Sequence, residues 1–477
     1  MKHINEEEQR LGPDKPQIWY SEKLPQPQAP FEVCYYFDYV FGTSTGGLIA
    51  IMLGRLRMSV DDALKAYENL AGKVFAHRRP LSFYGVVRSM YDHRELVDAV
   101  NEVVRMKRST ILERPASRGP EINCIQDMVL NQPDEPRVDD VQQAVGGLLD
   151  SGPTFNSDPS MCRTVCVAYA AIESSKEDPF LFRSYEHLKN TDAWKFDKGN
   201  YKNGTRYDPS GEHHWAAFER NPGPAHALPI ASVARCTTAA TGFFKPMTLG
   251  DVQFVDGALG CNNPSAEALN EVIQMHNGNS AAVKLLLSVG TGQAEVTRIG
   301  RGRLSRMVQA GKAAVGVLTG TEETHQHMLE RASDLSGTLR YERFNVPKAL
   351  GIGEMPMDIW NDKVRERIKT KTEEYLNSPS VKGELSEDEN LRSIAQMLVK
   401  ARRERAATRR WPISTSQVRY RCTVEKCDNG QKVRNTFDEM WSHIQREHFP
   451  KLPDRTKASR EEREKVEKII NSGQVLH

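Results

Sequence analysis

A serine that can act as a nucleophile lies in segment 42–47, which reads Gly-Thr-Ser-Thr-Gly-Gly. A strand-like run, Tyr35–Phe41, precedes this segment, and an apolar helix-like run, Leu48–Leu53, follows it. A G-x-S-x-G sequence at a strand-to-helix turn holds its serine forward on a sharp, strained backbone. The pattern therefore predicts acyl transfer through Ser44. The glycines that let the backbone turn tightly are Gly42, Gly46 and Gly47.

A phosphate-binding loop is the alternative for the same segment. Gly42 and Gly47 have the spacing of the Walker A glycines, but Leu48 stands where that motif requires lysine. The segment is therefore not a Walker A loop.

The serine needs a base, because a hydroxyl is a poor nucleophile until a neighbouring group takes its proton. Asp256 is the best candidate, since it ends a short apolar strand and Gly257 lets the following loop pass close by. A Ser-Asp-His triad is the alternative, because α/β-hydrolases run in that chain order. Its histidine candidates are His325 and His327 after Asp256, and His213, His214 and His226 in an insertion before it.

A second chemical cluster lies near the C-terminus. A Cys₂His₂ array with ligand spacing typical of zinc fingers consists of Cys422-x₄-Cys427, a gap of fifteen residues and His443-x₄-His448. The central gap exceeds the usual twelve residues. We expect a structural zinc ion, because about 30 residues with few apolar side chains do not hold a fold alone. A single finger reads only about three base pairs, so sequence-specific nucleic-acid binding is not expected, and a protein partner or weak nucleic-acid attachment fits better.

Strand-like and helix-like segments alternate along the chain, which predicts an α/β fold with a mostly parallel, helix-covered sheet. The segment from 284 to 289 is nearly all apolar, which predicts burial on both faces. Two polar insertions, 112–160 and 187–229, interrupt the alternation. The expected strands are 33–41, 163–171, 180–184, 252–255 and 284–289, and the expected helices are 47–54, one capped by Ser59, and one between Asn263-Pro264 and Asn277-Gly278.

Several blocks together resemble the patatin-like phospholipases. These blocks are the serine segment, 239–246 (Ala-Ala-Thr-Gly-Phe-Phe-Lys-Pro), 254–258 (Phe-Val-Asp-Gly-Ala) with 262–264 (Asn-Asn-Pro), and 288–292 (Ser-Val-Gly-Thr-Gly), in the family's order over roughly residues 30–375. Ala258 replaces the second glycine of the family's usual Asp-Gly-Gly. The resemblance implies a three-layer α/β/α fold and a lipid acyl hydrolase of the phospholipase A or lysophospholipase type. It implies Ser44 as nucleophile and Asp256 as base in a Ser-Asp dyad without catalytic cofactor, and the N–H of Thr45 fits an oxyanion donor.

One departure from the family concerns its glycine-rich oxyanion loop, which the resemblance places upstream of the serine. Residues 1–41 contain one glycine, Gly12, and Met1–Leu11 fits the end of the helix that should follow the loop. We therefore expect the first strand and the loop to be absent from this sequence, leaving unpaired sheet backbone. The chain is then either a truncated form of a working enzyme or a weakened or inactive relative.

Bulk properties exclude some classes of protein. The net charge of +2 gives no global field for nucleic acid or membrane. The first residues lack the apolar stretch of a secretory signal, no apolar run spans a membrane, and eight cysteines are too sparse for a disulfide scaffold. We expect a reducing, cytoplasmic setting, with peripheral membrane contact left open.

The expected organisation is an acyl hydrolase domain over 1–380, a charged helical linker over 381–415, the zinc-finger-like module over 416–450 and a charged tail over 451–477. Three functions follow as hypotheses. The chain is a lipid acyl hydrolase, a catalytically silent lipid- or protein-binding relative, or a zinc-finger regulatory protein.

Overall fold

The structure is a computed structural model of the 477-residue chain. The chain divides into two compact units, one of Met1–Asp38, Ser160–Cys162 and Gly383–His477, and the other of Tyr39–Pro159 and Arg163–Lys382. The structure describes residues 1–14, 29–78, 89–107, 153–158, 161–172, 175–187, 201–202, 205–206, 221, 225–249, 252–293, 307–335, 337–353, 355, 361–378, 386–408, 411, 419–425, 427, 432–434, 437–453 and 457–475.

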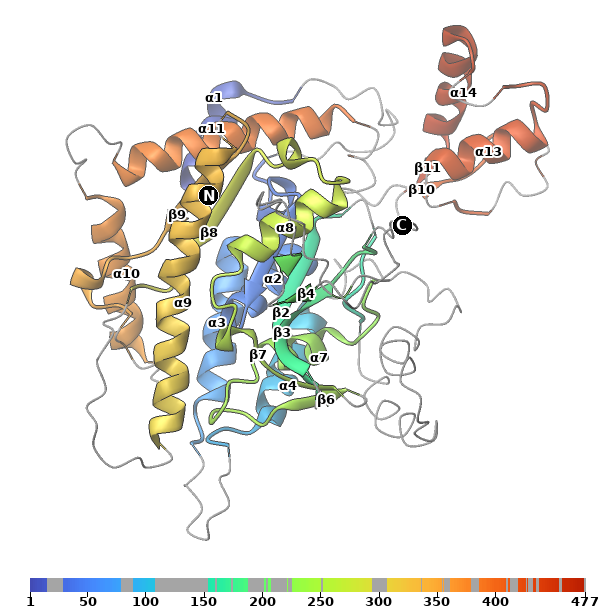
Figure 1. Ribbon diagram of the computed structural model, residues 1–477. Coiled ribbons are helices and arrows are strands. Elements are labelled where there is room, and N and C mark those ends of the chain that lie inside the picture. Colours follow the sequence, from blue (N-terminus) through green and yellow to red (C-terminus); the bar gives the residue numbers. More distant parts are fainter. Residues whose placement is uncertain are drawn as a thin grey trace, which may run out of the picture. The chain divides into compact units, whose positions relative to one another are not determined.

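The unit that contains Ser44 and Asp256 alternates strands with helices, as expected from the sequence (Figure 1). Its strands are β1 (Tyr39–Thr43), β2 (Arg163–Ile172), β3 (Ser175–Arg183), β4 (Tyr201–Lys202), β5 (Thr205–Arg206), β6 (Met247–Leu249), β7 (Val252–Asp256), β8 (Leu285–Val289) and β9 (Arg340–Phe344). Its α-helices are α2 (Thr45–Ala50), α3 (Val60–Val74), α4 (His93–Met106), α7 (Ile230–Thr237), α8 (Ser265–Met275), α9 (Met307–Asp334) and α10 (Asp362–Leu376).

The main sheet of this unit is mixed. β1 pairs with β2 in parallel, with Thr43 opposite Val167. β2 also pairs antiparallel with β3 and with β7, and β7 with β6. The parallel pair of β8 and β9 forms a separate sheet among the described strands. The α/β class is confirmed, but the prediction of a mostly parallel main sheet is wrong for the described strands, because three of the four strand pairings that reach β2 or β7 are antiparallel.

Alternate residues of β2 belong to two different cores, which gives the unit helices on both sides of its sheet. Cys166, Ala168 and Ala170 pack with apolar residues of α2, α3, α4 and α7. Val165 and Val167 pack instead in a cluster that includes Met275 of α8. This period of two is what a strand buried on both faces requires. The expected layering of helix, sheet and helix is therefore confirmed.

Two of the predicted strands differ in detail. Residues 33–35 form a short 3₁₀ helix, and the strand predicted from residue 33 begins at Tyr39. The segment around β8 was predicted to be buried on both faces, but Val289 is 75% exposed and its three leucines are only half-buried. The other predicted elements correspond to β2, β3, β7, α2, α3 and α8.

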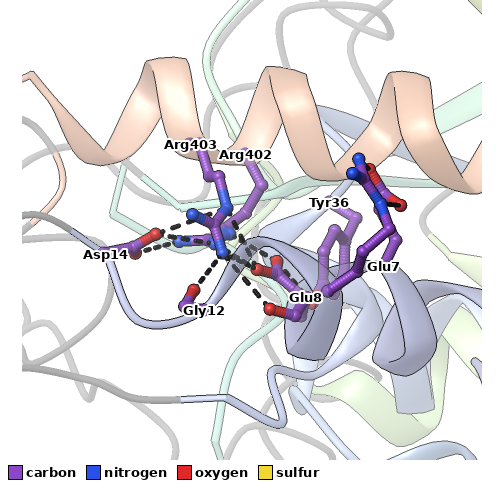
Figure 2. A network of polar contacts seen from close by, with 8 residues as sticks. Glu7, Glu8, Gly12, Asp14, Tyr36, Arg402 and Arg403 are labelled. Carbon is purple, nitrogen blue, oxygen red and sulfur yellow. Dashed lines mark hydrogen bonds and ion pairs between the residues drawn. The ribbon is translucent and has the colours of Figure 1, made fainter.

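The second unit contains α1 (Lys2–Leu11) and α11 (Glu387–Ala406), which are far apart in sequence and in contact in the structure. Arg402 is fully buried and forms a bidentate pair with Glu8, from Nε to Oε1 at 2.9 Å and from Nη2 to Oε2 at 2.7 Å. Arg402 also bonds Asp14, and Arg403 donates to Glu8 and to the Gly12 carbonyl (Figure 2). This ion network fastens the two helices together.

The charged linker predicted over 381–415 is helical, but α11 is not exposed all round. Ile394, Ala395, Leu398 and Val399 are buried on one face. Its N-terminus carries a capping box between Ser386 and Glu389. The many arginines of this segment predict a helix exposed to solvent, but its four apolar residues at helical spacing are buried.

The C-terminal residues form a small module with its own core. It contains β10 (Arg419–Tyr420), α13 (Phe437–Glu447), α14 (Arg460–Ser472) and β11 (Gln474–Val475), with β10 and β11 antiparallel. Met440 and Ile444 of α13 are buried, as are Val466 and Ile470 of α14. Residues that the sequence assigned to a charged tail therefore build part of the fold. The predicted domain boundaries themselves stay predictions.

Most of the two predicted insertions, 112–160 and 187–229, lies outside the described residues. No helix among those that the structure describes is both long enough and apolar enough to cross a bilayer.

Candidate active site

The predicted nucleophile lies at a strained turn between β1 and α2. Ser44 follows the last residue of β1 and has φ 57° and ψ −124°, a conformation that non-glycine residues seldom adopt. Its carbonyl accepts from the N–H of Gly47 at 2.9 Å and of Leu48 at 3.2 Å, which starts the helix. The backbone thus has the strand-turn-helix geometry that gives G-x-S-x-G its meaning.

The glycines of this turn have different requirements. A Cβ atom on Gly42 would lie 2.0 Å from the carbonyl oxygen of Gly46, and one on Gly47 would lie 2.7 Å from Cγ2 of Thr237. A Cβ atom on Gly46 meets nothing within 4 Å. The close approach of strand and helix therefore demands glycine at 42, and the Thr237 side chain of α7 occupies the space beside 47, whereas 46 has no such requirement.

Asp256, the predicted base, is the last residue of β7 and contacts the serine directly. The Ser44 hydroxyl donates to Asp256 Oδ2 with an Oγ–Oδ2 distance of 2.5 Å. The other carboxylate oxygen, Oδ1, accepts from the N–H of Ala258 at 2.8 Å, and the Asp256 N–H donates to the Ala239 carbonyl. The structure therefore brings together two residues that are 212 positions apart in sequence.

Gly257 allows the Asp256 loop to lie against the sheet. A Cβ atom here would be 2.5 Å from the Val167 carbonyl oxygen and 3.0 Å from Cγ2 of Thr43. The sequence predicted a close approach at this glycine, and the structure shows which strands it approaches.

Burial changes the acidity of Asp256. The residue is 5% exposed, and desolvation raises the pKa of its carboxyl to about 6, although the hydrogen bonds from Ser44 and Ala258 lower it. The carboxyl is therefore ionised at neutral pH, and its pKa lies close enough to 7 for proton exchange with a substrate.

Two threonines that the sequence did not single out hold this site together. The Thr43 hydroxyl donates to the Cys261 carbonyl at 2.8 Å, which ties the end of β1 to the loop after Asp256. The Thr237 hydroxyl accepts from the Ser44 N–H at 3.0 Å. Thr237 lies two residues before one of the family-like blocks, but no pattern in one sequence distinguishes its hydroxyl from that of Thr238.

The predicted oxyanion donor, Thr45, is the first residue of α2 and is exposed. The first N–H groups of a helix have no partner inside the helix, and the helix dipole favours negative charge there. The position of Thr45 therefore suits a donor that faces a substrate.

Histidines do not take part in the contacts of Ser44 and Asp256 in the described structure. His325 Nδ1 lies 3.1 Å from the Tyr341 hydroxyl, and buried His226 accepts from the Arg183 N–H. Desolvation and Arg183 lower the pKa of His226 to about 3. His213 and His214 lie outside the described residues. The geometry thus favours the dyad over the triad.

The predicted metal ligands lie together in the C-terminal module. One ligand atom from each of Cys422, Cys427, His443 and His448 falls within 4.8 Å of the others. Cys422 Sγ is 3.3 Å from His448 Nε2, and Cys427 Sγ is 3.4 Å from His443 Nε2. Tetrahedral zinc, with Zn–S of about 2.3 Å and Zn–N of about 2.0 Å, separates its ligand atoms by about 3.3–3.8 Å. The cluster could therefore hold a metal ion.

Curated relatives of the chain carry phospholipase names. Patatin-like phospholipase 1 of Plasmodium falciparum (isolate NF54) is 24% identical over 360 residues, which cover 71% of this chain and 41% of that protein. Calcium-independent phospholipase A2-gamma of Mus musculus is 23% identical over 363 residues, covering 76% and 36%. Phospholipase A I of Arabidopsis thaliana is 22% identical over 349 residues, covering 72% and 24%. The chain thus spans less than half the length of each of these relatives.

The match to a protein family covers the region that contains both catalytic candidates. The patatin-like phospholipase family matches residues 23–269, just over half of the 477 residues, and this range includes Ser44 and Asp256. The chain belongs to the patatin-like phospholipase family.

Proposed function

We propose that the chain hydrolyses fatty-acyl esters of lipids, in the manner of a phospholipase A or lysophospholipase, through a Ser44–Asp256 dyad. The hydrogen bond of 2.5 Å from the Ser44 hydroxyl to the buried Asp256 carboxylate carries this proposal. A serine hydroxyl that donates to a carboxylate supports the proposal, because acyl transfer requires at least a nucleophile and a base in contact. The names of the relatives support a phospholipid ester as substrate.

The reaction has two halves. In the first, Ser44 Oγ attacks the ester carbonyl carbon, Asp256 takes the hydroxyl proton, and the tetrahedral intermediate collapses with loss of the alcohol, which receives that proton. In the second, Asp256 takes a proton from water, which attacks the acyl-enzyme. The fatty acid leaves, and the proton returns to Ser44 Oγ.

The negative charge of each tetrahedral intermediate needs donors. The Thr45 N–H at the start of α2 supplies one, because the residue after the nucleophile contributes to the oxyanion hole of such turns. The Ser44 N–H donates to Thr237 and is not a second donor in this conformation. Both catalytic groups belong to the protein, so we expect turnover in the presence of a chelator.

Hydrolysis of p-nitrophenyl butyrate and of phosphatidylcholine and lysophosphatidylcholine vesicles tests the proposal. Wild type should turn over and Ser44→Ala should lose at least about 10³-fold in kcat, since the hydroxyl is the nucleophile. Asp256→Asn should lose a similar factor. Asp62→Asn is the matched control, because Asp62 pairs with Lys107 at the start of α3 and should keep wild-type activity.

Each outcome has a meaning. If wild type and Ser44→Ala are equally inert, hydrolysis is abandoned in favour of a lipid- or protein-binding relative. If Asp256→Asn retains activity while Ser44→Ala does not, another base serves Ser44 and the dyad is wrong. If p-nitrophenyl butyrate is hydrolysed and neither lipid is, the chain is an esterase and the proposed lipid substrate is wrong.

We also propose that Cys422, Cys427, His443 and His448 bind one structural zinc ion. Four protein ligands fill a tetrahedral shell and leave no open position for chemistry, which is typical of structural sites. The ligands connect the β10 region to α13, so the ion would fix the strand region against the helix. A role in contacting a protein partner is the function that we assign to this module, and its partner chemistry is left to experiment.

Metal analysis of the purified full chain tests the zinc site. We expect about one zinc per chain, and the double variant Cys422→Ser with Cys427→Ser should lose it. Cys162→Ser is the control, since Cys162 lies outside the cluster. Unchanged zinc in the double variant would remove the site.

A further inference from the structure

We propose that Thr237 is a positioning residue for the nucleophile, and that its hydroxyl holds the strained backbone of Ser44 against β2. This inference rests on the proposed function, in which Ser44 is the nucleophile. It assigns a role to a residue outside the serine segment and outside the Asp256 loop.

The hydrogen bonds of Thr237 have a fixed direction. Its Oγ1 lies 2.6 Å from the Val167 carbonyl oxygen and 3.0 Å from the Ser44 nitrogen. A hydroxyl carries one hydrogen, which must go to the carbonyl because a carbonyl only accepts. The same oxygen is then an acceptor for the Ser44 N–H. Thr237 thus connects the nucleophile's backbone to the middle strand of the sheet.

The Ser44 N–H depends on this hydroxyl. Ser44 lies between the last residue of β1 and the first residue of α2 and has a positive φ. Thr237 Oγ1 is the acceptor that the described structure provides for its N–H. Thr237 is fully buried at the end of α7, and Ser44 is half-buried. An N–H that loses its acceptor at such a site costs stability.

Packing reinforces the hydrogen bond. A Cβ atom on Gly47 would lie 2.7 Å from Thr237 Cγ2 and 2.8 Å from Oγ1. The threonine therefore occupies the space that a side chain at 47 would need, and touches the turn on both sides of Thr45 and Gly46. This contact explains in part why 47 is glycine.

The position of the Ser44 backbone matters because the reaction tolerates only a small displacement of Ser44 Oγ. Ser44 Oγ must remain near 2.5 Å from Asp256 Oδ2 and also face the substrate carbonyl. A misplacement of about 1 Å can cost about 10²-fold in rate. Releasing the Ser44 N–H lets the strained turn relax, which moves the hydroxyl away from the base without altering where the substrate binds.

Substitution by Val and by Ser separates the hydroxyl from the volume of Thr237. Thr237→Val keeps the shape and removes the hydroxyl, and we expect kcat on p-nitrophenyl butyrate to fall about 10- to 100-fold with KM unchanged. Labelling of Ser44 by a fluorophosphonate should slow in parallel. Thr237→Ser should return both rates to within about 3-fold of wild type, because it keeps the hydroxyl.

Thr238→Val is the matched control. Thr238 is also buried, but its hydroxyl donates to the Ala234 carbonyl within α7. It should lose stability comparable to Thr237→Val and keep kcat. A merely structural role would lower the melting temperature of Thr237→Val without a specific fall in kcat.

Several results overturn the inference. A folded Thr237→Val variant with the kcat of wild type would overturn it. A Thr237→Ser variant as slow as Thr237→Val would also overturn it. If Thr237→Val does not fold, Thr237→Ala removes the same hydroxyl without setting a methyl group against the Val167 carbonyl. Equal kcat in Thr237→Ala and Thr237→Ser would then overturn it. Wild type as inert as Ser44→Ala overturns both proposals, whereas Ser44-dependent turnover that ignores Thr237 overturns only this one.

Discussion

Thr43 and Asp256 pair with consecutive residues of β2 along the same edge, Thr43 with Val167 in parallel and Asp256 with Ala168 in antiparallel register, while β3 pairs along the other edge. One strand thus sets the distance between the turn that carries Ser44 and the carboxylate that contacts it. A slip of one residue in either pairing would turn every side chain of that strand to the other face. The contact between Ser44 and Asp256 is therefore a consequence of sheet register as much as of loop geometry.

The first prediction concerns the pH dependence of turnover. Burial raises the pKa of Asp256 to about 6, and a protonated carboxyl cannot accept the Ser44 proton. On a neutral p-nitrophenyl ester we expect kcat/KM to be level near pH 7.5 and to fall about tenfold per pH unit below about 6. Melting temperatures over the same range serve as the control for unfolding. A rate that stays level to pH 4.5 would contradict the base role.

The second prediction concerns stability. Because the folded pKa of Asp256 is raised from 3.8 to about 6, its stabilising contribution as a neutral acid is complete below about pH 4 and is lost as the pH rises through 6. The charged form costs about 3 kcal/mol. Asp256→Asn avoids this cost, so it should be more stable than wild type at pH 8 and similar at pH 4.

Urea denaturation of the full chain at the two pH values measures this difference. Asp62→Asn should show no such gain at pH 8, because Lys107 stabilises the charged form of Asp62 and lowers its pKa. An Asp256→Asn variant less stable than wild type at pH 8 would show that its hydrogen bonds outweigh desolvation.

The third prediction distinguishes the glycines of the turn. Gly42→Ala should unfold or inactivate the chain, because its Cβ would lie 2.0 Å from the Gly46 carbonyl oxygen. Gly46→Ala should fold and gain about 0.5–1 kcal/mol, since alanine favours helix over glycine and meets no atom within 4 Å. Circular dichroism melts compare the two. A stable Gly42→Ala would mean that strand and helix are further apart than described.

The fourth prediction concerns the network in Figure 2. Arg402→Met removes the fully buried arginine of the pair with Glu8 and leaves Arg403 as the arginine that contacts this carboxyl group, which should cost about 3–5 kcal/mol. Arg392→Met on the same helix is the control, because its pair with Asp388 is exposed and contributes little. Equal unfolding midpoints in urea for the two variants would contradict a stabilising role for the network.

The sequence predicted the ends of helices in this fold better than the pairing of its strands. The cap at Ser59 begins α3, and Asn277 and Gly278, both with positive φ, follow α8, because capping and turn signals are local. No local sequence signal determines whether neighbouring strands run parallel or antiparallel, and the prediction of a mostly parallel main sheet was therefore wrong. Ser459 and Glu462 form the capping box of α14, and this signal was present in what was assigned to a tail.

The candidate site was predictable where chemistry and motif coincide. Ser44, Asp256, Gly257 and the four Cys and His residues were all chosen from the sequence, and the structure brings each set together. Their catalytic and metal-binding roles stay predictions. Thr237 was not predicted, because its contact with the Ser44 N–H joins residues 193 positions apart and depends on the three-dimensional fold.

The pairing of β10 with β11 links the Cys/His cluster to the far end of the module. The Arg421 N–H, next to the candidate ligand Cys422, donates to the Gly473 carbonyl at 2.8 Å, and a Cβ atom on Gly473 would lie 2.0 Å from the Arg421 carbonyl oxygen. Removing residues from 473 onward would expose the backbone that holds the first cysteine. A fusion joined just after residue 475 would likewise begin beside Arg419 of β10, close in sequence to the candidate ligand Cys422, so expression tags on this protein belong elsewhere.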